Sequence, residues 1–253
     1  MTDPYESPKS ELQDRVPTTG IVGSLGTAVA GEYSYAISDV MKEAWSLVKG
    51  AKLPILLAGI IAIGIVMAVQ QVIVYLSVDP QSYLSGGEFL KGIAISQLQS
   101  IVALPVTLPL FTGLMFVGIN RACGKATLIG DLFFCFSKLV PLLAIGVISM
   151  ICMSIGYILL FVPGLYLAVA YIFAAPLVVE KNLSPWQALE SSRKAVTHSW
   201  FKTLGLILLL GLIVALSAIP LLIGLIWTLP FTIIAYGVLY RVIFGVEDLK
   251  EVV

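Results

Sequence analysis

The sequence predicts an all-α membrane protein whose chain crosses the bilayer six times, as three helical hairpins with amphipathic helices on the cytoplasmic side. Long apolar segments separated by short polar stretches and the one-sided placement of basic residues are the main observations behind this prediction. Of 253 residues, 58% are hydrophobic and only 12% are charged, whereas soluble domains have about 25% charged residues. This composition predicts an integral membrane protein.

The basic residues predict the orientation of the chain. Of the 15 Lys and Arg residues, 14 lie in alternate stretches that flank or connect the apolar segments, which places them on one side of the membrane. Only Lys91 lies on the other side. Cytoplasmic loops carry an excess of Lys and Arg. We therefore expect both termini in the cytoplasm and the hairpin turns on the outer side.

The chain divides into residues 1–34, an N-terminal cytoplasmic tail or linker, and residues 35–253, a six-span membrane domain. In the tail, Pro and Gly interrupt any helical or strand period. In the membrane domain, six segments meet or approach the ~20 apolar residues needed to cross a bilayer. They are residues 53–76, 93–119, 139–161, 165–179, 204–219 and 221–244, of which the fourth and fifth are short.

Two hairpin turns are marked by Pro and Gly, which stop one helix and permit a reversal. Val162, Pro163 and Gly164 separate the third and fourth segments, and Pro220 with Gly224 separates the last two.

Each hairpin follows a segment with a mixed polar and apolar pattern. In the first, Ile37, Val40 and Ala44 share one helical face. In the third, Ser184 and Pro185 provide a helix cap and a first-turn proline. The middle segment, residues 127–138, has a less regular period but is also interpreted as a helix. We expect these segments to lie along the cytoplasmic interface.

Residues 161–194 read FVPGLYLAVAYIFAAPLVVEKNLSPWQALESSRK. The segment has a Pro-Gly turn, an apolar span ending in Ala175 and Pro176, and then Ser-Pro-x-x-Ala-x-x-x-Ser. It resembles a broad bacterial superfamily that includes YciC-type inner-membrane proteins and the membrane domain of some glycerophosphoryl diester phosphodiesterases. The resemblance implies a six-span protein of the bacterial inner (cytoplasmic) membrane. It does not imply the phosphodiesterase activity, which belongs to a separate soluble barrel.

The titratable residues favour a protein without enzymatic activity or a cofactor. The single histidine, His198, lies on the expected polar face of an amphipathic helix, and no His, Cys or carboxylate cluster has metal-ligand spacing. The balance of 15 basic and 15 acidic residues, without a basic run, disfavours nucleic-acid binding.

Polar residues and prolines within the apolar segments are candidates for a pore lining or a hinge. Gln70 and Gln97 either line a pore or cavity or, as we favour, make interhelical hydrogen bonds or lie at the membrane interface. Pro105 and Pro109 each remove a backbone hydrogen bond, so they should bend or break the second span. Broken helices frame binding sites in transporters, although packing against neighbouring helices is the simpler explanation.

Arg193 is the main candidate for lipid contact. Its guanidinium has the geometry to bind a lipid phosphate, with Lys194, Lys202, Trp186 and Trp200 completing an interfacial pocket. The simpler alternative is that Arg193 snorkels to the interface or forms an ion pair with Glu190, three residues earlier.

Together these observations favour a non-enzymatic protein that binds or moves lipids or small amphiphiles, or that organises the envelope. An oligomeric channel or passive pore, and an accessory subunit of a membrane complex, remain alternatives. Membrane lipids are the expected partners, and a homo-oligomer is possible. The sequence does not name the ligand.

Overall fold

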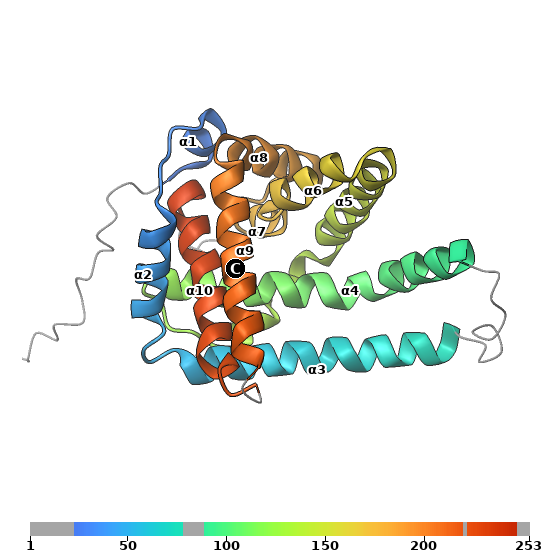
Figure 1. Ribbon diagram of the computed structural model, residues 1–253, viewed down its shortest axis with the longest axis horizontal. Helices are drawn as coiled ribbons and strands as arrows, with labels where there is room; N and C mark the ends of the chain where they lie inside the picture. Colours follow the sequence, from blue (N-terminus) through green and yellow to red (C-terminus); the bar gives the residue numbers. More distant parts are fainter. Residues whose placement is uncertain (1–22, 78–88, 220–221, 247–253) are drawn as a thin grey trace, which may run out of the picture.

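The computed structural model describes residues 23–77, 89–219 and 222–246 (Figure 1). Residues 1–22 of the expected tail, Pro220 and the C-terminal residues 247–253 lie outside this part of the chain. All regular elements in the described residues are helical. They are α1 (Leu25–Ala30), α2 (Ile37–Leu47), α3 (Lys52–Ser77), α4 (Phe89–Ala122), the 3₁₀ helices η2 (Ile129–Leu132) and η3 (Phe134–Lys138), α5 (Leu139–Leu159), α6 (Phe161–Ala170), α7 (Ala174–Glu180), α8 (Pro185–His198), α9 (Trp200–Ala218) and α10 (Leu225–Phe244).

The all-helical class is confirmed, together with six helical segments that are long and apolar enough to cross a membrane. These segments are Lys52–Leu76, Gln97–Ala122, Ile129–Leu159, Phe161–Glu180, Trp200–Ala218 and Leu225–Phe244. They differ strongly in how much they pack within the protein. In an 18-residue stretch of α10, 61% of the residues are buried, compared with 22% in α3. Helix α10 is therefore the central helix of the fold.

The long helices do not form a bundle of parallel rods. In Figure 1, α3 and α4 run across the view, whereas α9 and α10 run up and down it. Helices α4 and α10 share the most extensive packing between elements, and they cross at two glycines. A Cβ atom on Gly237 would lie 2.3 Å from the backbone carbon of Gly118. Only glycine permits this approach, because the two backbones themselves are in contact.

The turn between α5 and α6 is shorter than the sequence predicts. Helix α5 ends at Leu159, only Leu160 is extended, and α6 begins at Phe161. Pro163 and Gly164 therefore lie in the first turn of α6 and not between the helices. Proline is tolerated there, because the first-turn N–H groups have no partner within the helix. A Cβ atom on Gly164 would lie 2.4 Å from the ring of Tyr157, so this glycine allows the two helices to pack closely.

The fourth apolar segment is two helices, not one. Residues 171–173 interrupt it between α6 and α7. The buried hydroxyl of Ser192 on α8 donates to the carbonyl of Ala170 at 2.7 Å and accepts from the N–H of Phe173 at 3.3 Å. Ser192 thus partners two backbone groups at the break, which explains the last Ser of the Ser-Pro-x-x-Ala-x-x-x-Ser pattern.

The segment at residues 127–138 also differs from the expected amphipathic helix. It forms two 3₁₀ helices, η2 and η3, and the carboxylate of Asp131 accepts from the N–H of Leu128. The backbone of Leu132 lies against α4, where a Cβ atom on Gly113 would be 2.1 Å from the Leu132 carbonyl oxygen. The tight contact with α4 and the local cap favour short turns over a regular helix.

Residues 23–36 pack onto the membrane domain. A Cβ atom on Gly23 would lie 2.3 Å from the carbonyl oxygen of Ile243 on α10, and Ala28 is fully buried. The Tyr33 hydroxyl donates to the carbonyl of Ala195 at 2.6 Å. The packed part of the chain therefore begins before residue 35, where the sequence placed the domain boundary.

Helices α2 and α8 each bury one face. In α2, Val40 and Ala44 are buried, while Lys42 is exposed. In α8, Ser184 caps the first turn and Pro185 is its first residue, as expected. Helix α2 packs against α10, and α8 packs against α1, α5, α6, α7 and α9.

Candidate functional site

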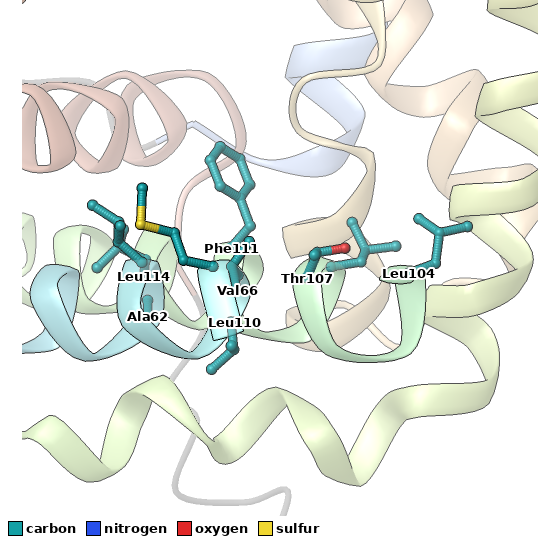
Figure 2. Close-up of a pocket in the computed structure, with 10 residues that line it drawn as sticks. Ala62, Val66, Leu104, Thr107, Leu110, Phe111 and Leu114 are labelled. Atoms are coloured by element: carbon teal, nitrogen blue, oxygen red, sulfur yellow. The ribbon is translucent and has the colours of Figure 1, made fainter. Parts of the chain in front are cut away.

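An apolar groove between α3 and α4 is the candidate functional site. It has a volume of about 620 Å³, within the ~300–1,000 Å³ of typical small-molecule sites. Figure 2 shows side chains from both helices around it. The lining residues are Ala62, Ile63, Val66 and Met67 from α3, and Leu104, Thr107, Leu108, Leu110, Phe111 and Leu114 from α4.

The groove has almost no polar character. Thr107 contributes its only hydroxyl, which donates to the carbonyl of Ala103 at 3.1 Å and is thus used within α4. A ligand would therefore meet methyl, methylene and phenyl groups and one thioether. Such a surface binds hydrocarbon and disfavours ions and water, because a polar ligand would lose its hydrogen bonds there.

Two prolines lie beside the lining residues of α4. Of the expected bend or break, the break does not occur, because helix α4 continues from Phe89 to Ala122 through Pro105 and Pro109. Neither proline has an N–H to donate, so the carbonyls of Ile101 and Pro105 lose their usual helical donors. Leu104 and Leu108 line the groove from positions adjacent to the prolines.

The glutamines singled out in the sequence do not line this groove. Gln70 and Gln97 are exposed, and neither side chain makes a hydrogen bond to another residue in the described part of the chain. Gln71, beside Gln70, is also exposed and without such a bond. Of the two explanations favoured for Gln70 and Gln97, interhelical hydrogen bonds are not formed among the described residues.

Arg193 lies against Glu190. Its Nε is 2.8 Å from one carboxylate oxygen and its Nη2 is 2.7 Å from the other. The two hydrogen bonds from Arg193 lower the pKa of the Glu190 carboxyl, and those from Arg193 to Glu190 and Tyr166 raise the pKa of the guanidinium. The fork that would bind a phosphate is therefore already occupied by a carboxylate.

Among the remaining candidates for the interfacial pocket, Lys194 shares Glu190 with Arg193, whereas Trp200 and Lys202 contact other residues. The Nζ of Lys194 is 3.5 Å from Glu190. The indole N–H of Trp200 donates to the carbonyl of Tyr166 at 3.3 Å, and Lys202 lies 6.0 Å from the ring centroid of Tyr35. Trp186 is 63% exposed. The buried face of α8 consists of Ala188, Leu189, Ser192, Ala195 and Val196.

Sequence reasoning missed a set of buried charged groups around the end of α10. Arg241 donates to the carbonyl of Ala122 and lies 2.6 Å from the carboxylate of Glu43. The neighbouring Tyr240 donates to the buried carboxylate of Glu180. The sequence did not indicate these pairs, because the partners lie on α2, α4, α7 and α10, which are far apart along the chain. These contacts connect the helices, since buried charges require partners.

The described residues offer no other evident chemistry. Among them, no three His, Cys, Asp or Glu side chains gather closely enough to hold a metal ion. His198 lies beside the N-terminal segment, with its Nε2 3.3 Å from the carbonyl oxygen of Val29.

Fold and composition together define a multi-pass membrane protein. No family model, curated protein or solved structure matches the chain. The resemblance of residues 161–194 to the bacterial superfamily therefore stays a prediction.

Proposed function

We propose that this protein is a non-enzymatic membrane protein that binds a lipid or another small amphiphile, with its acyl chain in the α3–α4 groove. The groove itself is the observation that carries the proposal. Its lining matches hydrocarbon chemically, and its volume suits a small ligand. A water-filled pore would require polar lining groups, so the groove favours lipid binding over the channel alternative.

The proposal includes a membrane arrangement. The six spans form three hairpins: α3 with α4, residues 129–159 with residues 161–180, and α9 with α10. Helices α2 and α8 lie on the cytoplasmic side as amphipathic helices, and both termini are cytoplasmic. The basic residues support this orientation. The resemblance of residues 161–194 supports a bacterial inner membrane.

Lipid retention by a variant with a filled groove tests the proposal. Met67 lines the groove and is 65% exposed, so Met67→Trp should fill the groove without disrupting the packing of α3 on α4. Ile151→Trp on α5 is the matched control, because Ile151 is 54% exposed and does not line the groove. Both variants should be released gently from membranes and measured by native mass spectrometry.

We expect the wild type and Ile151→Trp to retain a bound lipid, and Met67→Trp to lose most of it. Equal lipid retention by the two tryptophan variants would contradict the proposal. A photoactivatable fatty acid provides a second measurement. Its crosslinks should concentrate at Leu104 and Phe111, and their yield should reach a plateau at low fatty-acid concentration. The yield of crosslinks on α5 should keep rising as the fatty-acid concentration increases.

A further inference from the structure

Two basic residues lie at one end of the α3 and α4 pair that forms the groove. Lys52 is the first residue of α3, and Arg121 is the second-to-last residue of α4. The guanidinium of Arg121 donates to the carbonyls of Leu47 and Lys49, just before α3, at 2.9 and 2.6 Å. Each helix of the groove therefore contributes one cation to the same corner.

Both basic residues are in line with the groove along their own helices. An α-helix turns by about 100° per residue, so Ile63, eleven residues after Lys52, is rotated by only about 20° from it. Leu114, seven residues before Arg121, is likewise within about 20° of Arg121. Because Ile63 and Leu114 line the groove, the corner lies at an end of the groove and not on another side of the helices.

The separation between Lys52 and the groove suits an acyl chain. A helix rises by about 1.5 Å per residue, which places Ile63 about 16 Å along α3 from Lys52. One leaflet of a bilayer has about 15 Å of hydrocarbon, half of the ~30 Å core. Gly59 lies between the two on the same face, and a Cβ atom on it would meet nothing within 4 Å. A chain therefore has open space beside Gly59.

The charges at the corner favour an anionic headgroup. The Nζ of Lys52 lies 5.3 Å from the ring centroid of Trp227, which positions the ammonium, and an ammonium has three N–H donors for other partners. Arg121 uses its Nε and Nη2 for the two carbonyls, and a guanidinium has five N–H donors in all. Glu43, the nearest acidic residue along α2, is bonded to Arg241. The corner is therefore positively charged.

From these observations we infer that the ligand of the groove is a phospholipid with a net negative headgroup. The headgroup binds at Lys52 and Arg121, and an acyl chain passes Gly59 into the groove. This inference rests on the proposed function and adds the class of lipid. A lysine at the end of a spanning helix also reaches the interface without selecting a lipid, so lipid selectivity is the property that separates the two cases.

Competition between two lipids tests the headgroup site. The protein is reconstituted into vesicles with equal amounts of phosphatidylglycerol, which is anionic, and phosphatidylcholine, which is zwitterionic. It is then released gently, and the retained lipids are measured by native mass spectrometry. The variants are Lys52→Met and the charge-retaining Lys52→Arg. Lys138→Met is the matched control, because Lys138 directly precedes α5, is partly exposed like Lys52, and bonds to Asn182.

We expect the wild type, Lys52→Arg and Lys138→Met to retain phosphatidylglycerol in preference. Lys52→Met should lower the ratio of phosphatidylglycerol to phosphatidylcholine about fivefold, the effect of one lysine near anionic lipid. Equal ratios for Lys52→Met and Lys138→Met would overturn the inference. A wild type without preference, whose lipids are nevertheless lost in Met67→Trp, would overturn it and leave the proposed function intact. A wild type that retains neither lipid would overturn both.

A pair of glycine variants tests the path of the acyl chain. Gly59 and Gly64 both lie on α3, and a Cβ atom on either would meet nothing within 4 Å. Gly64, however, is rotated by about 120° from Lys52. We expect Gly59→Leu to lower the total amount of retained lipid and Gly64→Leu to match the wild type. Equal retention by the two variants would overturn the inference, because the chain would then not pass Gly59.

Discussion

The arm, residues 63–77 of α3 and 89–104 of α4, and the region around α10 are both apolar but pack differently. Around α10, buried side chains contact helices that are distant in the sequence, and glycines bring backbones together at Gly118 and Gly237. In the arm, Met67, Val72 and Tyr75 project outward from the protein. Apolar segments therefore differ in their surroundings: around α10 the side chains pack against other helices, whereas in the arm many of them are exposed.

The polar groups show the same contrast. Near α10 and α8, Arg241, Glu43 and Ser192 have partners within the chain. In the arm, Gln70 and Gln71 make no hydrogen bond to the described residues. Because lipid does not drive helices together by the hydrophobic effect, close packing and polar contacts decide which helices associate. The polar groups around α10 make such contacts within the chain, whereas Gln70 and Gln71 make no hydrogen bond to the described residues.

The same substitution on α10 and on α3 should have the largest and most divergent effects. Gly237→Ala places a Cβ atom 2.3 Å from the backbone of Gly118, so α4 and α10 must separate. We expect a loss of at least about 1–3 kcal/mol, the range for overpacking. Gly59→Ala meets nothing within 4 Å and should be neutral or stabilise α3 by up to about 1 kcal/mol.

Thermal unfolding in detergent micelles, followed by circular dichroism, measures both effects. Equal melting temperatures for Gly237→Ala and Gly59→Ala would show that α4 and α10 do not cross in backbone contact.

A smaller effect is expected at the break between α6 and α7. Ser192→Ala removes the hydroxyl that contacts Ala170 and Phe173, which should cost about 1–3 kcal/mol because buried backbone groups lose a partner. Ser191→Ala is the matched control, since Ser191 makes no hydrogen bond to the described residues. Denaturant unfolding in micelles should separate the two variants; the same midpoint for both would argue against the role of Ser192.

The smallest effect should come from the Glu190 and Arg193 pair at the edge of the packed region. Because folding lowers the pKa of Glu190, the pair stabilises the fold above the ordinary glutamate pKa of about 4.3. This stabilisation is lost as the pH falls through the lowered pKa. A partly exposed pair contributes less than about 1 kcal/mol. We expect wild type and Glu190→Gln to differ slightly at neutral pH and to converge in acid, as measured by unfolding at several pH values. A difference that grows on acidification would contradict this assignment.

The sequence predicted the helical elements well because their signals are local. Continuous apolar runs are enough to place the six spans, and Ser184 with Pro185 is enough to start α8. The misplaced turn at Pro163 shows the limit of local signals. Proline is compatible both with a turn and with the first turn of a helix, and the contact of Gly164 with Tyr157 decides between them.

The candidate site was less accessible to sequence reasoning. Pro105 and Pro109 lie beside lining residues of α4, but the groove itself depends on how α3 lies against α4. Arg193 has two plausible partners in the sequence, a lipid phosphate and Glu190, and the contact with Glu190 is visible only in the structure.

By itself, the sequence determined the membrane class, the helical character and the positions of the spans, because hydropathy and helical period are properties of neighbouring residues. Tertiary structure alone decided the crossing of α4 and α10, the groove and the pairing of Arg241 with Glu43. These features join residues that are distant along the chain. Their formation depends on shape and on partners for buried polar groups, which no local pattern specifies.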